Sequence, residues 1–280
     1  MEKNRQGGIE KTIEQESIIY SLNLQEKKAK IIGYNKSNGK ITIPRIVKYE
    51  STEYIITSIS SYAFRYTQID WLCFSDESEL EIIENRAFGN ANIQRFTIPP
   101  HLTKICEYAF YSCKRLKIIE IPPNSELKTI EKYSFAFSSI ESFTIPENLI
   151  DLQKEWCYGT PKLTEIYVSP KNPRYITYDD GKIILGKSSF ESENYDNLVF
   201  CVRNIKYVTI PSFIETILPY SFGQCGSLRE IKIPNDSSLK AIEKHAFRES
   251  AIEIIIIDSN EIELKEMCFS GANKLKKVIF

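Results

Sequence analysis

The side chains on which most enzymes depend are scarce in this sequence. Its 280 residues contain two histidines, His101 and His245, so acid–base chemistry and histidine-rich metal sites have little to build on. None of the seven cysteines forms a C-x-x-C pair, and glycine-rich phosphate loops and the G-x-S-x-G motif are absent. We therefore predict a non-enzymatic protein with no catalytic residue, no bound metal and no cofactor.

Charge of one sign, long apolar runs and paired cysteines are lacking as well. The chain has 36 lysines and arginines against 37 aspartates and glutamates, which gives no electrostatic reason to expect nucleic acid or an anionic membrane as a partner. No apolar run approaches the roughly 20 residues of a membrane-spanning helix, and residues 1–16 are too polar for a secretory signal. An odd number of cysteines does not build a dense disulfide framework.

The chain does have a strong internal repeat. A small residue followed by phenylalanine recurs at intervals of 22 to 25 residues in two blocks, and Cys157, preceded by Trp156, takes the place of the phenylalanine between them. Ile or Leu stands five positions before this column, and a small residue stands three positions after it. Such self-similarity predicts a stacked repeat architecture. The column contains Phe64, Phe88, Phe110, Phe135, Phe222, Phe247 and Phe269.

Each repeat runs into a short alternating segment that most often ends in Ile-Pro, as in residues 96–99 and 231–234. The alternation predicts a strand with one buried face, and the proline predicts its end because proline has no N–H to donate. The segment around the phenylalanine is less regular, and we predict a turn or a short helix there. A unit this short cannot bury its own apolar face, so the units are expected to stack.

The repeat pattern I/L-x-x-x-A/S-F-x-x-C/S/T/A-x-x-L-x-x-I-x-I-P resembles the BspA-like leucine-rich repeat family over roughly residues 30–280. The resemblance implies an α/β repeat solenoid, a right-handed leucine-rich-repeat superhelix with mostly parallel strands on the concave face and short helical or irregular convex segments. It also implies a surface antigen that binds extracellular matrix or host-cell proteins, such as fibronectin. The chain departs from the family where Glu84, Glu131 and Glu243 stand in place of the frequent glycine.

We expect one continuous solenoid domain over residues 29–280, after an N-terminal segment, residues 1–28, that is partly disordered. The turn signal Asn38-Gly39 predicts a β-hairpin cap within residues 29–56. Leucine-rich repeats fill residues 57–168 and 207–280. Between them, residues 169–206 are predicted to be an insertion with a second hairpin at Asp179-Asp180-Gly181.

Three isolated features have an ordinary structural interpretation beside a functional one. Cys113 and Cys225 share their column with serine, threonine and alanine, which favours small core packing over a nucleophilic or redox role. His245 replaces a tyrosine of its column and is not an evident general base. Asn35 and Asn235 begin glycosylation sequons, which matter only if the chain is exported.

The surface most suited to recognition is the concave sheet, where the outward side chains vary from repeat to repeat. Variable aromatic, apolar and charged groups on a fixed scaffold are typical of a protein-binding face. The alternative for the isoleucines is that they are strand formers on a solvated sheet. The predicted binding residues are Trp71, Arg95, Ile118, Glu120, Glu165, Tyr167, Tyr207, Glu230, Lys232, Ile254 and Ile256.

Two functions remain open at this stage. The resemblance favours an adhesin-like protein at the cell surface or secreted, binding its ligand through the concave sheet. The missing signal and anchor, and cysteines suited to a reducing compartment, favour a cytoplasmic scaffold for protein interactions. Nothing in the sequence favours an enzyme. Phe280 falls inside a strand with no cap after it, which predicts self-association through the last layer.

Overall fold

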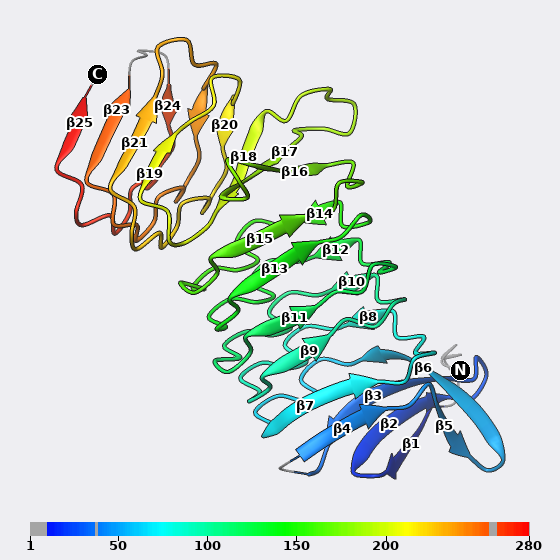
Figure 1. The fold of residues 1–280 in the computed structure, drawn as a ribbon. Helices are drawn as coiled ribbons and strands as arrows, with labels where there is room; N and C mark the ends of the chain where they lie inside the picture. Colours follow the sequence, from blue (N-terminus) through cyan, green and yellow to red (C-terminus); the bar gives the residue numbers. More distant parts are fainter. Residues whose placement is uncertain (1–9, 37–38, 258–261, 280) are drawn as a thin grey trace, which may run out of the picture. The chain divides into compact units, whose positions relative to one another are not determined.

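The computed structural model describes residues 10–36, 39–257 and 262–279 and contains two compact units, Met1–Ser138 and Ser139–Phe280 (Figure 1). In both units the chain winds through stacked turns that each contribute one longer and one very short strand to two separate sheets, with the apolar core between them. Each unit is a stretch of β-solenoid. Phe280, on which the expected uncovered layer depends, lies outside the described residues.

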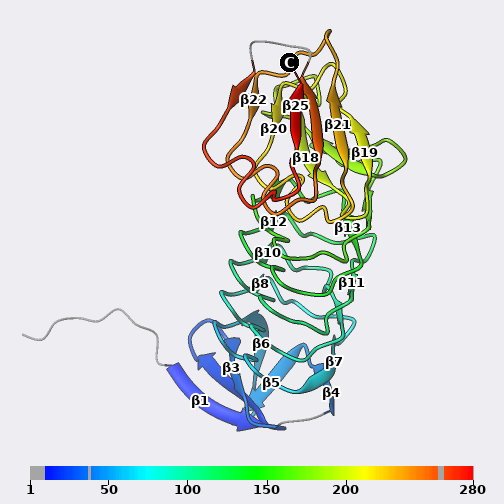
Figure 2. The same cartoon turned by 90° about the vertical axis from the view of Figure 1, so that its left-hand side faces the viewer.

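The first unit begins with antiparallel strands and continues with parallel ones. One sheet has the order β1-β2-β3-β6-β8-β10-β12, with β5 paired to β6, and a second sheet has the order β11-β9-β7-β4 (Figure 2). The strands are β1 Glu10–Gln15, β2 Ile18–Asn23, β3 Lys28–Tyr34, β4 Gly39–Ile43, β5 Ile46–Tyr49, β6 Thr52–Ile59, β7 Ile69–Phe74, β8 Ile82–Ile83, β9 Arg95–Thr97, β10 Lys104–Ile105, β11 Ile118–Glu120 and β12 Thr129–Ile130.

The strands predicted to form the N-terminal hairpin do not pair with each other. β3 pairs antiparallel with β2 and parallel with β6, whereas β4 pairs with β7 in the opposite sheet. Ala29 and Ile31 of β3 and Ile41 and Ile43 of β4 are all buried, so the two strands cover the core from two sides. β3 and β4 therefore belong to opposite sheets and do not form one hairpin, and residues 37 and 38 of the predicted turn lie outside the described part.

The phenylalanine column lies at the centre of the core. In the first unit the rings of Phe64, Phe88, Phe110 and Phe135 stack with centroids 5.1, 4.9 and 5.1 Å apart. All four side chains are fully buried. Offset-stacked rings at this separation add to the free energy gained by burying their area, so the column holds successive turns together.

The segments around the phenylalanines are turns, and no helix occurs in the described residues, so the prediction of short helical segments and of a mixed α/β fold was wrong. The residues two before and two after the phenylalanine have positive φ, which an α-helix excludes. These residues are mostly not glycine. They are Tyr62, Tyr66, Arg86, Asn90, Tyr108, Ser112, Tyr133, Phe137, Tyr220, Gln224, His245 and Glu249, with further members in the remaining repeats.

Hydrogen bonds to the next repeat keep these turns in place. Phe64 donates its N–H to the carbonyl of Ala87 at 2.7 Å, and Tyr66 donates to the carbonyl of Gly89 at 3.1 Å. The same two bonds recur one repeat later, from Phe88 to Ala109 and from Asn90 to Tyr111, both at 2.8 Å. The residues between them bond locally, three positions back along the chain. With these left-handed residues, every second N–H group along the turn points toward the neighbouring repeat.

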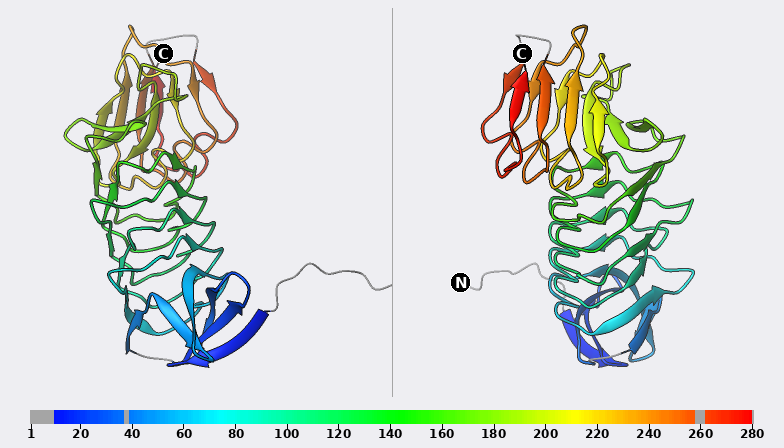
Figure 3. Two further views of the ribbon diagram at one scale, coloured as in Figure 1. Left: turned by 90° about the vertical axis from the view of Figure 1, so that its right-hand side faces the viewer. Right: turned by 60° about the vertical axis from the view of Figure 1, so that its left-hand side comes forward.

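The second unit also has two rows of strands, and each row is interrupted. A six-stranded sheet has the order β16-β17-β18-β20-β22-β24, while the other row consists of a pair, β13-β15, and a four-stranded sheet, β19-β21-β23-β25 (yellow to red in Figure 3). The strands are β13 Ser142–Ile145, β14 Asp151–Leu152, β15 Glu165–Val168, β16 Tyr175–Tyr178, β17 Ile183–Gly186, β18 Asn197–Cys201, β19 Tyr207–Thr209, β20 Thr216–Ile217, β21 Glu230–Ile233, β22 Ala241–Ile242, β23 Ile254–Ile257, β24 Glu263–Leu264 and β25 Lys277–Ile279.

The break coincides with the insertion. β16 pairs antiparallel with β17, β17 pairs antiparallel with β18, and β18 then pairs in parallel with β20 of the next repeat. The insertion therefore contributes its strands to the row of short strands and contributes none to the other row. β15 is therefore an end strand of one sheet and β19 an end strand of another, and the two do not pair.

Gly186 at the end of β17 allows close packing of the insertion. A Cβ atom at this position would lie 2.8 Å from Val199 Cγ2 and 3.1 Å from Tyr175 Cδ1. We expect Gly186→Ala to lower the free energy of unfolding by about 1–3 kcal/mol, the usual cost of overpacking. Urea denaturation measures the loss. Gly226→Ala is the matched control, since a Cβ there meets nothing within 4 Å, and an equal loss in both variants would contradict the packing argument.

Candidate protein-binding surface

All eleven predicted binding residues lie on the outer face of the longer strands, the face turned away from the core. They alternate along each strand with buried residues such as Leu72, Phe96, Ile166 and Val208. This placement follows from the period of two in a strand. The residues divide into groups within the two units, and their exposure differs.

In the first unit Trp71, Arg95 and Ile118 lie side by side on β7, β9 and β11, as their register partners show. The Trp71 and Ile118 side chains are 42% and 40% exposed. Lys40 on β4 extends the row, and its Nζ lies 4.0 Å from the centroid of the Trp71 ring, a cation–π contact. The sequence did not indicate Lys40, because its strand was assigned to a hairpin.

Glu120 is the fourth predicted residue of this group, and it contacts two neighbouring side chains. Its carboxylate lies 3.5 Å from Arg95 Nε and accepts a hydrogen bond of 2.7 Å from Thr97 Oγ1. Arg95 is about half exposed, so the ion pair is solvated and contributes little to stability. The row offers an aromatic ring, an aliphatic side chain and a paired charge to solvent.

In the second unit four of the predicted residues lie across β21 and β23. Glu230 is the register partner of Ile254, and Lys232 is the register partner of Ile256. The pattern of the sequence predicted that Ile254 and Ile256 would be exposed. In the structure both are half-buried by their neighbours. Packing between adjacent strands therefore uses part of their apolar area, and these two isoleucines offer less to a partner than the tyrosines do.

The other three residues, Glu165, Tyr167 and Tyr207, meet at the break between β15 and β19, in a groove of about 410 Å³. Tyr167 and Tyr207 are 57% and 67% exposed, the latter more than any other large apolar or aromatic side chain in the described residues. The Tyr167 hydroxyl donates to Glu165 Oε2 at 3.2 Å. The charge of Glu165 and this hydrogen bond raise the pKa of Tyr167 above its ordinary value.

The break explains why the groove exists. In regular turns the residue before the strand donates its N–H to the equivalent carbonyl of the previous turn, as Arg229 does to Lys206 at 2.7 Å. At the insertion this bond is made earlier along the chain. The N–H of Arg203, before β19, donates to the carbonyl of Leu163, before β15, at 3.0 Å. β15 and β19 start from neighbouring positions but do not pair, and the space between them stays open.

Charged groups of the insertion border this groove. Asp180 and Lys182 come from the β16–β17 turn, and Lys206 directly precedes β19. Sequence reasoning identified the Asp179-Asp180-Gly181 turn but could not place it beside the tyrosines, because the contact depends on the broken strand row. The groove thus combines two aromatic rings with side chains of both charges.

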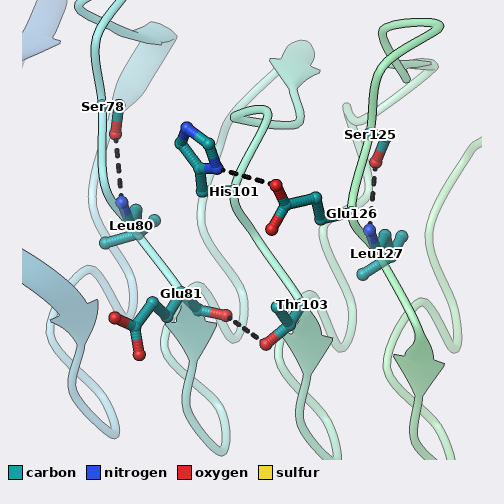
Figure 4. Close-up of polar contacts among 8 residues, drawn as sticks. All are labelled: Ser78, Leu80, Glu81, His101, Thr103, Ser125, Glu126 and Leu127. Atoms are coloured by element: carbon teal, nitrogen blue, oxygen red, sulfur yellow. Dashed lines mark hydrogen bonds and ion pairs between the residues drawn. The ribbon is translucent and has the colours of Figure 1, made fainter. Parts of the chain in front are cut away.

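A second groove, of about 750 Å³, lies in the first unit on the loops that lead into the short strands. Its lining includes Arg45, five acidic residues and His101, whose Nδ1 lies 3.0 Å from Glu126 Oε1 (Figure 4). Figure 4 also shows Thr103 Oγ1 donating to the Glu81 carbonyl at 3.1 Å. The His101 and Glu126 side chains are about half exposed, and no group of three potential metal ligands occurs in the described residues.

Comparisons with known proteins agree with the repeat and the fold. A sequence model described as "BspA type Leucine rich repeat region" matches residues 57–180 and 193–280 in six copies. No curated protein matches the chain. Among the described residues, the structure contains no helix of the length and apolarity that a membrane span requires.

Two solved structures are similar to this chain in fold. The pneumococcal vaccine antigen PcpA is 19% identical with a TM-score of 0.73, and the match covers 96% of this chain and 81% of that one. A leucine rich cell surface protein from Faecalibacterium prausnitzii is 17% identical with a TM-score of 0.53, covering 96% and 94%. At this identity the likeness concerns the fold alone.

Proposed function

Because the chain belongs to the BspA type leucine rich repeat family, we propose that it is a non-enzymatic module that binds a protein ligand through its outer strand faces. The observation that carries the proposal is the groove between β15 and β19, where Tyr167 and Tyr207 stand exposed beside Glu165. Exposed tyrosines supply large contact areas at low entropic cost, and they are enriched among residues that dominate binding energy.

The groove suits a polypeptide better than a small molecule. It is an open depression at the break in a strand row, bordered by Asp180, Lys182 and Lys206 as well as by the rings. Interfaces between proteins typically combine an aromatic centre with a polar, charged rim. The facing strands β15 and β19 also end their sheets, and such ends can pair with an extended segment.

We further propose an adhesin-like role at the cell surface, with extracellular matrix or host-cell proteins as ligands. Support comes from the family and from two structures of similar fold, one named a vaccine antigen and the other a cell surface protein. An intracellular interaction scaffold is the second candidate, because all seven cysteines are free thiols, as is usual in a reducing compartment.

We expect Tyr167→Ala and Tyr207→Ala each to weaken ligand binding by about 1–3 kcal/mol, the range of a binding hot spot. Surface plasmon resonance with immobilised fibronectin and other matrix proteins measures the change. Tyr66→Ala is the matched control, because Tyr66 is 60% exposed but lies on a turn away from either groove. Unchanged affinity in both groove variants would rule out this site, and binding to no matrix protein would contradict the adhesin role.

Antibody staining separates the two locations. An antibody against residues 57–280, applied to intact and to permeabilised cells of the native organism, is expected to stain intact cells. Staining that requires permeabilisation would overturn the surface role and leave the intracellular scaffold, with the groove still as its binding site.

A further inference from the structure

Arg203, between β18 and β19, is a buried cation without a carboxylate partner. The residue is 4% exposed, and within the described residues its guanidinium makes no ion pair with Asp or Glu. A guanidinium does not lose its charge by deprotonation in a protein. Because a buried charge is costly unless an opposite charge or a set of hydrogen bonds compensates it, the surroundings of Arg203 have to supply that compensation.

The hydrogen bonds of Arg203 supply little of it. Its Nη1 donates to the Ser221 carbonyl at 3.3 Å and lies 3.8 Å from Cys225 Sγ, while its Nη2 lies 3.9 Å from Cys157 Sγ. Sulfur is a weak acceptor. The Nε–H group has no hydrogen-bond partner in the described part of the chain. The Phe200 ring, whose centroid lies 4.3 Å from Cζ, makes a cation–π contact that replaces only part of the lost hydration.

The two neighbouring sulfur atoms do not bring a negative charge. Burial raises the pKa of the Cys157 thiol to about 11, which keeps this thiol neutral. The Cys225 thiol faces the carbonyls of Cys201 and Val202 at 4.0 and 3.8 Å, and carbonyl acceptors favour its protonated form. No anionic group among the described residues therefore compensates the charge of Arg203.

A small cavity borders Arg203 where the phenylalanine column is interrupted. Cys157 takes the place of a phenylalanine in that column, and its short side chain lines the cavity together with the Trp156 and Phe200 rings. The cavity has a volume of about 40 Å³, and Arg203 is part of its wall. Since about 10–15 Å³ already holds one water molecule, there is room for an ion of one or a few atoms.

The charge of the cavity wall favours an anion. Besides Arg203, the wall contains Lys154 and Glu155, so two positive charges stand against one negative charge. The Glu155 carboxylate accepts a hydrogen bond from the Tyr220 hydroxyl, whereas Arg203 Nε–H has no acceptor within the described residues. A water molecule would offer an acceptor but no charge, and a cation would add to the positive excess.

We propose that this cavity binds a small monovalent anion, chloride under physiological conditions, which compensates Arg203 and fills part of the space of the missing ring. Arg203 supplies the charge and the N–H donors. The Trp156 and Phe200 rings exclude water, which strengthens the attraction between the guanidinium and the ion. The cavity shares no lining residue with the groove between β15 and β19, so the anion site does not rest on the proposed ligand binding.

Trp156 provides the measurement, because it lies in the cavity wall and is 4% exposed. The full chain with Trp71→Phe is titrated with sodium iodide at constant ionic strength, which is maintained with sodium gluconate, whose anion is too large for the cavity. We expect quenching of Trp156 fluorescence that saturates, with half-saturation below about 0.15 M, the physiological ionic strength. Chloride is expected to reverse the quenching, because the two halides compete for one site.

The other tryptophan gives the comparison for collisional quenching. In the chain with Trp156→Phe, the emission comes from Trp71, which is 42% exposed and lies in the first unit. We expect iodide to quench Trp71 in proportion to its concentration, without saturation, and chloride not to relieve this quenching. A saturable, chloride-sensitive component is therefore expected for Trp156 alone.

Two arginine variants of the second unit test the role of the guanidinium. Arg203→Met, which keeps the length of the side chain, should remove the saturable quenching. Arg229→Met is the matched control and should keep it, because the Arg229 guanidinium has its own partner, Glu253, at 2.6 Å. In urea denaturation, chloride at about ten times its dissociation constant should raise the ratio of folded to unfolded chain about elevenfold over gluconate, and this gain should vanish in Arg203→Met.

Three results would each overturn the proposal. They are Trp156 quenching that chloride does not relieve, half-saturation above about 0.15 M, and saturable quenching that persists in Arg203→Met. The halide competition leaves the cavity unaltered, so it remains decisive if Arg203→Met does not fold. Affinity of Tyr167→Ala and Tyr207→Ala for a protein ligand is a separate measurement, and its failure leaves the anion site unaffected.

Discussion

Phe110→Ala is expected to lower the free energy of unfolding of the first unit by about 3–5 kcal/mol, the usual cost of deleting a buried phenylalanine. The Phe110 ring is fully buried and stacks between Phe88 and Phe135 at 4.9 and 5.1 Å. It also meets the edge of Phe96 at 4.8 Å. The substitution thus removes three aromatic contacts and leaves a cavity between rigid repeats that cannot collapse onto it.

The chain offers a convenient probe for this measurement. Its two tryptophans lie in different units, Trp71 in the first and Trp156 in the second. In a Trp156→Phe background, urea denaturation followed by fluorescence reports the first unit. Tyr66→Ala, in the same unit and 60% exposed, is the control and should change stability by less than about 1 kcal/mol. A loss at Phe110 no larger than that at Tyr66 would contradict a central role for the column.

Asn172→Ala is expected to destabilise the second unit by about 2–5 kcal/mol, because each buried polar group left without a partner costs about 1–3 kcal/mol. The Asn172 side chain is 4% exposed and uses its full hydrogen-bonding capacity. Its Nδ2 donates to the carbonyls of Pro146 and Leu149 at 2.6 and 2.9 Å. Its Oδ1 accepts from the N–H groups of Arg174 and Tyr175 at 2.9 and 2.8 Å.

Asn172 thereby ties the loop after β13 to the start of the insertion. Trp156 fluorescence in a Trp71→Phe background measures the effect on the second unit. Asn194→Ala, at an exposed position in the insertion, is the matched control and should be close to neutral. Asn172→Asp adds a sharper comparison, because it keeps an acceptor for the two N–H groups but opposes a carboxylate to two carbonyls. Wild-type stability of Asn172→Asp would refute this account of the site.

The repeat and its strands could be predicted because they depend on local pattern. Alternation of apolar and polar residues identified the longer strands, and the column of small and aromatic residues identified the stacking. The predicted outer residues accordingly lie on the outer face. The sequence could not indicate how exposed each would be, since the exposure of Ile254 depends on its neighbours Glu230 and Lys277 in register.

Turns were one of the two predicted alternatives around the phenylalanines, but their left-handed backbone conformation could not be predicted from the sequence. Positive φ is normally signalled by glycine or asparagine, yet Tyr62, Tyr108, Tyr133 and Tyr220 adopt it here. The bonds that these turns make to the neighbouring repeat and the buried phenylalanine between them determine the backbone, and neither is a local property. The same limitation applies to contacts between repeats, such as the one of 3.8 Å between Arg203 Nη1 and Cys225 Sγ, which joins residues 22 positions apart in sequence.

The hydrogen bonds of these turns all run one way along the stack, from the N–H groups of one repeat to the carbonyls of the next, as from Phe64 to Ala87 and from Phe222 to Ala246. Within each unit the peptide dipoles of this column therefore add up, as they do along a helix. One end of such a stack presents donors and the other presents acceptors. Two copies could continue the column only head to tail, because a head-to-head contact would oppose donors to donors. An assembly that continued these columns from one copy to the next would therefore be polar, with a direction along its length.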